Sequence, residues 1–388
     1  MGFVRWSLMG LVAGIALAGC GDFWQAPSSS SSTTTTTTLS SGYFYLIDQA
    51  TSQIVSFYIS SGTLEEVGAY AVPEPPVALT VAPNNDFLYV STAYGIYAYT
   101  LSSGVPTIEN SSQVIVSDPA AAMAIDSTSS WLIESSGTGT LNAVPIVTST
   151  GLVDTSASNC TSSSVICQVA LSGSAIHQIA ISPNNDYVFV AAGTTGTQAY
   201  GFKAANANPF GSAAYKTIAP ENSSAGAALA VAVDTSTRLL YIGEAAAYES
   251  STGGLRVFTI GSGGALTELS GSPYSSGGTG PHAILPKSTG DYVYVANWVG
   301  TSSGKIAGFA ISDSSGTYSL TSTSTTASTV VEPVGLIEDS NNNFVIAVGS
   351  VSTPYLDAYV FDTTTPSELD LTLYSSSAAA VGIAANYP

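Results

Sequence analysis

The chain has 388 residues and a formal net charge of −19, from 7 basic and 26 acidic residues. Charged residues make up only 9% of the chain, where a quarter is usual, while hydrophobic residues make up 45% and can form a large core. The negative charge excludes a nucleic-acid-binding surface and disfavours a phosphorylated substrate, because few lysines or arginines are present to meet a phosphate.

The first 19 residues predict a signal peptide. Arg5 supplies a positive charge, and Leu8–Leu17 is an apolar run too short to span a bilayer. Leu17, Ala18, Gly19 and Cys20 resemble a bacterial lipobox, in which the cysteine is acylated and becomes the new N-terminus. We therefore expect an exported protein that is lipid-anchored to a bacterial membrane through Cys20, on the periplasmic side or at the cell surface. An ordinary secretory signal with a chance cysteine is the alternative.

Residues 20–42 predict a disordered tether. Ser28–Thr38 is an unbroken run of serine and threonine, which buries too little apolar surface to offset the entropy of ordering the chain. Residues 43–388 are then left to form the folded domain.

A sequence motif recurs along this domain. It consists of an apolar segment, a turn and a strand of alternating apolar and polar residues. It is found at Ala78–Val90, Gln178–Val190, Gly280–Trp298 and Gly335–Ala347. The turn residue before each alternating strand returns at intervals of about 44 to 56 residues, at Asp86, Ser130, Asp186, Arg238, Asp291 and Asn343. Large residues two apart after each turn, such as Tyr292 and Tyr294, indicate half-buried strands.

These intervals predict a seven-bladed β-propeller with four antiparallel strands in each blade. Six copies are whole, and the seventh is divided between the two ends of the domain. Tyr43–Asp48, Gln53–Ile59 and Leu64–Ala71 have no first strand before them, and Ala378–Ala385 has no strand after it. We expect this C-terminal strand to close the ring beside the N-terminal strands, which hides the sheet edges. A β-sandwich array is the alternative, but it does not explain the divided copy.

The units at Tyr292–Asn297 (YVYVAN) and Ser182–Ala191 (SPNNDYVFVA) resemble the repeats of seven-bladed propellers of the lactonase and YVTN-repeat type. The resemblance implies the propeller fold over roughly residues 43–388. Some members of the group hydrolyse sugar lactones such as 6-phosphogluconolactone, and many others are exported proteins of unknown role. Propellers serve many unrelated functions, so the resemblance alone assigns none.

Cys160 and Cys167 lie in a long connection between the second and third copies. An exported chain meets an oxidising compartment, so this pair predicts a disulfide that closes a short loop.

Five carboxylates are predicted to lie on one rim of the ring, because the first strand of a blade starts on the face where the second strand ends. They are Asp48, Glu74, Asp118, Glu244 and Glu332. A hard cation such as calcium, or a polyol, is the ligand that such oxygens favour. The alternative is that these carboxylates have no ligand, because loop ends are polar throughout an acidic protein. Apart from this candidate calcium ion, the sequence assigns no cofactor.

The two histidines share one repeat position, since His177 and His282 each lie nine residues before the turn residue of their copy. The corresponding residues in the other copies are apolar. The resemblance to lactonase-type propellers implies that His282 is the better catalytic candidate, with Asn297 and Trp298 on the same rim. The alternative is that both are packing histidines.

Three functional classes stay open. The first is a binding or scaffold lipoprotein of the cell envelope, with an envelope glycan, a small neutral lactone or a protein as its partner. The second is a lactone hydrolase acting on a neutral lactone. The third is a propeller-type oxidoreductase, whose metal or quinone ligands we cannot assemble from the sequence.

Overall fold

The computed structural model describes residues 39, 41–136, 139–158, 160–161, 163–173, 175–211, 214–249, 251–299, 304–350, 355–361, 369–375 and 380–387, without the side chains of 324–328 and 371–375. The expected signal peptide (residues 1–19), Cys20 and most of the expected tether lie outside these residues. No helix in the described ranges is long and apolar enough to cross a membrane.

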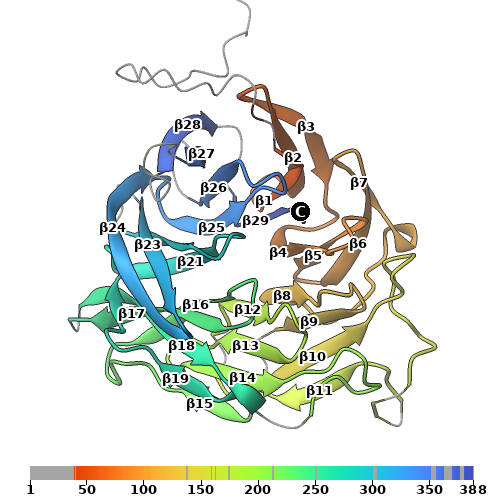
Figure 1. Ribbon diagram of the computed structural model, residues 1–388. Coiled ribbons are helices and arrows are strands. Elements are labelled where there is room, and N and C mark those ends of the chain that lie inside the picture. The colour runs from red at the N-terminus through yellow and green to blue at the C-terminus, as the bar shows by residue number, and fades with distance from the viewer. Residues whose placement is uncertain are drawn as a thin grey trace, which may run out of the picture.

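The described residues form seven antiparallel sheets arranged as blades of a ring around a central axis (Figure 1). Blade 1 has the strand order β29 (Gly382–Ala385), β1 (Phe44–Asp48), β2 (Gln53–Ser60) and β3 (Thr63–Ala71). Blade 2 comprises β4 (Pro76–Val81), β5 (Phe87–Thr92), β6 (Gly95–Ser102) and β7 (Val105–Ile108). Blade 3 comprises β8 (Ala122–Ile125), β9 (Trp131–Ser135), β10 (Thr140–Pro145) and β11 (Cys167–Ala170).

The remaining blades follow in chain order. Blade 4 comprises β12 (Gln178–Ile181), β13 (Tyr187–Ala191), β14 (Thr197–Gly201) and β15 (Lys216–Ile218). Blade 5 comprises β16 (Ala227–Val233), β17 (Leu239–Tyr248), β18 (Thr252–Ile260), β19 (Leu266–Glu268) and the short β20 (Tyr274–Ser275), which pairs with β18. Blade 6 comprises β21 (Gly280–Pro286), β22 (Tyr292–Trp298), β23 (Gly304–Ser314) and β24 (Thr317–Thr329). Blade 7 comprises β25 (Pro333–Glu338), β26 (Phe344–Gly349), β27 (Leu356–Phe361) and β28 (Leu369–Ser375). Two short 3-10 turns cover Asn110–Ser112 and Ser262–Gly264.

The predicted propeller is confirmed strand by strand. In the six whole copies the second strand of the blade begins at the residue directly after the predicted turn residue, at Phe87, Trp131, Tyr187, Leu239, Tyr292 and Phe344. The C-terminal strand closes the ring as expected, since β29 pairs with β1 from Phe44 opposite Ala385 to Ile47 opposite Gly382. Ring closure therefore rests on hydrogen bonds between the two ends of the domain.

In blades 3, 4, 5 and 7 a polar side chain caps the turn after the first strand: Asp126, Ser182, Asp234 or Asp339. Oδ1 of Asp126 accepts hydrogen bonds from the amides of Ser130 and Trp131, at 2.8 and 2.6 Å. Oδ1 of Asp339 accepts hydrogen bonds from the amides of Asn343 and Phe344 in the same way. The acidic and asparagine-rich segment from Asp339 to Asn343 is therefore a turn. The cap fixes the strand that follows because it satisfies amides that the ladder leaves unpaired.

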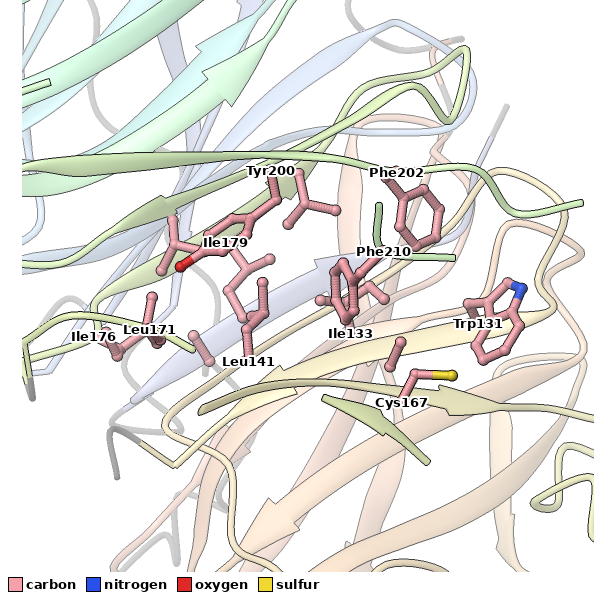
Figure 2. Close-up of a cluster of buried hydrophobic side chains, with 14 of the residues drawn as sticks. Trp131, Ile133, Leu141, Cys167, Leu171, Ile176, Ile179, Tyr200, Phe202 and Phe210 are labelled. Carbon is pink, nitrogen blue, oxygen red and sulfur yellow. The ribbon is translucent and has the colours of Figure 1, made fainter. Parts of the chain in front are cut away.

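The core lies between neighbouring blades, where the faces of two sheets interlock. Figure 2 shows the cluster between blades 3 and 4, with Trp131 and Ile133 opposite Tyr200, Phe202 and Phe210. The predicted disulfide joins Cys160 to Cys167, whose side chain is buried in this cluster. It ties a long connection to the core.

The folded body includes residues before the expected boundary at residue 43. Ser41 is buried, its amide donates to the Ile59 carbonyl at 2.9 Å, and its hydroxyl accepts the amide of Ile59 at 2.7 Å. Leu39 packs against the core of blades 1 and 7. The end of the predicted tether is thus part of the folded body, because a leucine there has an apolar surface to cover.

Polar side chains on the third strands hold the connections that arrive from the preceding blades. Gln198 on β14 exchanges two hydrogen bonds with the backbone of Ser172, at 2.6 and 2.9 Å. Arg256 on β18 donates to the Ala219 carbonyl at 2.8 Å in the corresponding place. We call the face of the ring on which these connections lie, where first strands begin and second strands end, the front face.

Candidate functional site

The first strands of the blades line a central channel, and a cavity of about 270 Å³ opens at the front end of that channel. The repeat position of the two histidines lines this cavity in six of the seven blades, through Val77, Ala121, His177, His282, Val334 and Val381. The repeat position shared by the two histidines therefore lies at the central channel. We call this cavity the channel mouth.

The back end of the channel is occupied by the C-terminus. Tyr387 lines two further cavities there, of about 390 and 280 Å³, formed by the ends of the first strands. Figure 1 shows the C-terminal end inside the ring, next to β29 and β4.

His282 lies on β21 with its ring stacked on Trp298 of β22. The two ring centroids are 4.0 Å apart and the planes differ by 20°. Nε1 of Trp298 donates to the Pro333 carbonyl of the next blade at 3.0 Å, which fixes the indole. Burial, with a smaller effect from the charge of His177, lowers the pKa of His282 to about 4. The imidazole is thus neutral at pH 7.

His177 precedes β12 and lines the same cavity from blade 4. Its backbone amide donates to the Ala191 carbonyl at 3.0 Å, which continues the pairing of β12 with β13. The side chain is more accessible than that of His282, yet partial burial still lowers its pKa. In the described part of the chain neither imidazole makes a side-chain hydrogen bond, so the cavity holds two neutral rings whose nitrogens have no protein partner.

The amide of Asn297 does not line the channel mouth. Its side chain is fully buried, and Nδ2 donates to the carbonyls of Ser276 and Val295 at 2.5 and 3.0 Å. These contacts hold the connection into blade 6. The repeat alignment places Asn297 at the end of the second strand, but it does not give the side of the sheet to which the side chain points.

The five predicted rim carboxylates are spread over separate environments. Glu244 is fully buried, accepts from Nη1 of Arg256 at 3.1 Å and from the Glu221 amide at 2.9 Å. Asp48 caps the turn after β1 by accepting the amides of Ala50 and Thr51. The other three, Glu74, Asp118 and Glu332, lie on separate front-face connections.

These positions bring no metal cluster together. Among the described residues no group of three or more histidine, cysteine, aspartate or glutamate side chains could hold a metal ion. Calcium binding at the rim therefore remains a prediction from the sequence that the described geometry does not strengthen.

Among the described residues no aspartate, glutamate, lysine or arginine lines the channel mouth, and its side chains are apolar apart from the two histidines and Gln178. Basic residues are engaged elsewhere. Arg256 pairs with Glu244 and Glu268, Lys203 pairs with Asp186, and Lys287 lies 4.3 Å from the ring centre of Phe361. The mouth thus offers no cation to an anionic ligand.

Two features of the front face were not found from the sequence. Met123 on β8 also lines the channel mouth. The only sequence signal for this is that Met123 lies two residues after Ala121, which holds the repeat position of the histidines in blade 3. Glu134 on β9 is fully buried, and burial raises its pKa to about 7. Its position corresponds to apolar residues in the other blades, so a period-2 count predicts a core side chain there.

The comparisons with known proteins agree with this architecture. The family described as "Lactonase, 7-bladed beta-propeller" matches residues 34–224. No curated protein sequence matches the chain significantly.

Solved structures share the fold at low sequence identity. A candidate 6-phosphogluconolactonase from Bacteroides fragilis is 13% identical, with a TM-score of 0.66 over 88% of this chain and 97% of that one. One from Bacteroides uniformis is 15% identical, with a TM-score of 0.67 over 88% and 98%. A protein from Lactobacillus plantarum is 18% identical, with a TM-score of 0.65 over 89% and 99%. With seven blades in the ring and the family matched over residues 34–224, the resemblance read from the sequence is confirmed: the chain is a lactonase-like seven-bladed β-propeller.

Proposed function

We propose that this propeller is an exported binding protein that takes a small uncharged ligand in the channel mouth. The observation that carries the proposal is the cavity of about 270 Å³, whose lining side chains are mostly apolar and include two neutral histidines, while polar atoms make up much of its exposed surface. A concave cavity that combines apolar side chains with a few convergent polar groups is the usual form of a small-molecule site. A neutral lactone or the apolar face of an envelope sugar has matching chemistry.

The lining argues against a phosphorylated ligand. A phosphate is normally bound by arginine, lysine or a set of backbone amides, and no described lining residue is an arginine or a lysine. A surface with a net charge of −19 also repels such an anion on its approach. The ligand implied by the names of the two Bacteroides structures is therefore the less suitable one for this chain.

Hydrolysis of a neutral lactone is the second candidate, favoured by the fixed and neutral ring of His282. A general base works best when its pKa lies near the working pH, and a pKa of about 4 makes His282 a weak base at neutral pH. No described carboxylate lines the cavity to orient or recharge the ring. These two facts favour binding over catalysis.

Anchoring to a bacterial membrane through Cys20 completes the proposal. It is supported by Arg5, the apolar run Leu8–Leu17 and the small residues directly before Cys20. Metabolic labelling with a fatty-acid analogue should mark the wild-type chain in the membrane fraction and leave Cys20→Ser unlabelled. An unlabelled wild-type chain would remove the anchor and leave the channel-mouth proposal standing.

The ligand is sought by a thermal-shift screen of the full chain with Cys20→Ser, against neutral lactones, neutral sugars, envelope glycans and phosphorylated lactones. All samples contain a metal chelator. A ligand that binds only the native state raises the melting temperature, and we expect this for a neutral compound and its loss in His282→Ala. A shift with the phosphorylated lactones alone would overturn the proposal, and no shift at all would favour a protein-binding scaffold.

A further inference from the structure

A buried carboxyl group and a buried amide lie side by side in blade 3, and each has one oxygen without a partner. Glu134 on β9 is directly opposite Asn142 on β10, and the two side chains are 0% and 3% exposed. Nδ2 of Asn142 donates to Oε1 of Glu134 at 2.5 Å. Among the described residues, Oε2 of Glu134 and Oδ1 of Asn142 meet no hydrogen-bond donor. The pair therefore has two free acceptors and lacks one donor.

The surroundings of the pair do not supply this donor. Alternation along β9 places Glu134 on the same side of the sheet as Leu132, which packs in the apolar cluster between blades 2 and 3. The titratable side chain of that cluster is Tyr89, whose hydroxyl donates to the Gly151 carbonyl. Asp118, on the connection from blade 2, is the charged group whose field reaches Glu134, and it has no proton to donate at neutral pH. The neighbouring strand β8 presents only apolar side chains.

Protonation of Glu134 would satisfy both oxygens at once. An ionised carboxylate would add a buried negative charge to two acceptors that already lack a donor, which is unfavourable. In the acid form, Oε2–H can donate to Oδ1 of Asn142 while Oε1 accepts from Nδ2. The acid and the amide are then joined by two hydrogen bonds. Burial, with a smaller effect from Asp118, also raises the pKa of Glu134 to about 7, although the hydrogen bond from Asn142 opposes this.

We propose that Glu134 is a neutral acid that donates its carboxyl proton to Asn142, and that this pair is a pH-sensitive latch on the wall of the channel mouth. Two contacts join the pair to that wall. Met123 lies opposite Glu134 in the pairing of β8 with β9, and the Ala121 amide donates to the Ser135 carbonyl at 2.8 Å. Both Ala121 and Met123 line the channel mouth.

The latch opens as the pH rises. The carboxyl proton is lost to water, Oδ1 of Asn142 loses its donor, and β9 then carries a buried charge behind the wall. Because the folded state binds the proton more tightly than the unfolded state, the stabilisation is complete below the unfolded pKa and is lost as the pH rises through the folded pKa of about 7. The latch does not depend on the ligand proposed above.

The pair is tested by NMR on the full chain with Cys20→Ser and glutamate labelled with carbon-13 at the carboxyl group. Glu134→Gln assigns the Glu134 signal, which should remain that of a neutral acid until the pH nears about 7. The side-chain amide signals of Asn142 should change with the same midpoint. Asp118→Asn removes the neighbouring charge and should move both midpoints to lower pH. A carboxylate signal for Glu134 at pH 5.5, or Asn142 signals that stay constant throughout, would overturn the pair.

Hydrogen exchange of the peptide that covers residues 116–125 tests the latch. After correction for the intrinsic exchange rate, protection in the wild type should fall roughly tenfold between pH 5.5 and pH 8.5. Glu134→Gln should stay protected at both values, because glutamine is neutral and its Nε2 can donate to Asn142. Glu65→Gln, at an exposed position on β3, should behave as the wild type does. Equal wild-type protection at both values would overturn the latch. If Glu134→Gln does not fold, the wild-type titration and exchange still decide, with Glu134 assigned through its backbone.

Discussion

Asn85 and Tyr387 exchange two hydrogen bonds across 302 residues of sequence: Nδ2 of Asn85 donates to the Tyr387 carbonyl at 2.9 Å, and the Tyr387 amide donates to Oδ1 of Asn85 at 2.7 Å. Asn185 makes the corresponding contact in an internal blade, where its Oδ1 accepts the Ser127 amide at 3.1 Å. Both asparagines have a left-handed backbone, with φ of 61° and 56°, which their turns require. The last residues of the chain are therefore held as an ordinary blade junction is.

Loss of this junction should loosen the end of the ring. Asn85→Ala removes both hydrogen bonds, and we expect a loss of about 1–2 kcal/mol in the free energy of unfolding. Hydrogen exchange should rise in the peptide that covers residues 380–387. Asn185→Ala is the matched control, which should cost a similar amount without exposing that peptide. Unchanged exchange at residues 380–387 in Asn85→Ala would contradict the role of this contact in closure.

Arg256 should be the most sensitive polar side chain of the front face. Arg256→Met leaves Glu244 fully buried without its cation, which typically costs about 3–5 kcal/mol. Adding Glu244→Met to this variant removes the stranded charge, so the double variant should be more stable than Arg256→Met alone. Urea unfolding measures the free energy of unfolding of the wild type, Arg256→Met and the double variant. A double variant that is less stable than Arg256→Met would show that the pair is not coupled in this way.

The protein should lose stability as the pH rises toward neutrality. Burial raises the pKa of Glu134 from 4.5 to about 7, and that of Asp357 from 3.8 to about 6. The folded state then binds these protons more tightly than the unfolded state. The contribution is complete below the unfolded pKa and is lost as the pH rises through the folded pKa.

Glu134→Gln tests the larger of these two effects. The variant should melt at a higher temperature than the wild type at pH 8 and at a similar temperature at pH 4, because glutamine stays neutral throughout. Glu65→Gln, at an exposed position on β3, removes the same charge without burial and should show a much smaller difference. If Glu134→Gln changes the melting temperature equally at both pH values, Glu134 does not titrate as described.

Trp298 should set the protonation of His282. With only two histidines, the ring proton signals of the chain can be assigned by one substitution each. In an NMR titration His282 should stay neutral until the pH nears about 4. Trp298→Ala admits water to the ring and should raise this pKa toward 6.5, the ordinary value of a histidine. A wild-type His282 that titrates near 6.5 would contradict the burial described here.

The sequence predicted the fold well because the signal for a propeller blade is local and repeated. Tyr292 and Tyr294 two residues apart, after a turn, indicate a strand, and six such copies at similar intervals fix their order. The divided seventh copy predicted the pairing of β29 with β1, since an unpaired edge is costly. The shared repeat position of His177 and His282 likewise places both residues on the lining of one cavity.

The side-chain contacts of the site could not be predicted in the same way. Asn297 and Trp298 are neighbours on β22, yet their side chains make different contacts. The buried Asn297 donates to the Ser276 carbonyl, whereas Trp298 stacks on His282. The pairing of Glu244 with Arg256 depends on the register of β17 and β18, which a count of intervals does not give. Met123 has no polar signal, and only its position in the ring brings it to the channel mouth.

The most direct test of the central claim, that the channel mouth binds a small uncharged ligand, uses the two histidines as reporters. The full chain with Cys20→Ser and labelled histidine is titrated with the compounds found by the thermal-shift screen, in the presence of a chelator, and the imidazole signals are followed by NMR. We expect a neutral compound to shift the signals of both His177 and His282, and we expect Ala121→Leu, which narrows the cavity, to abolish these shifts. A compound that raises the melting temperature while both signals stay unmoved would place the binding site elsewhere and contradict it.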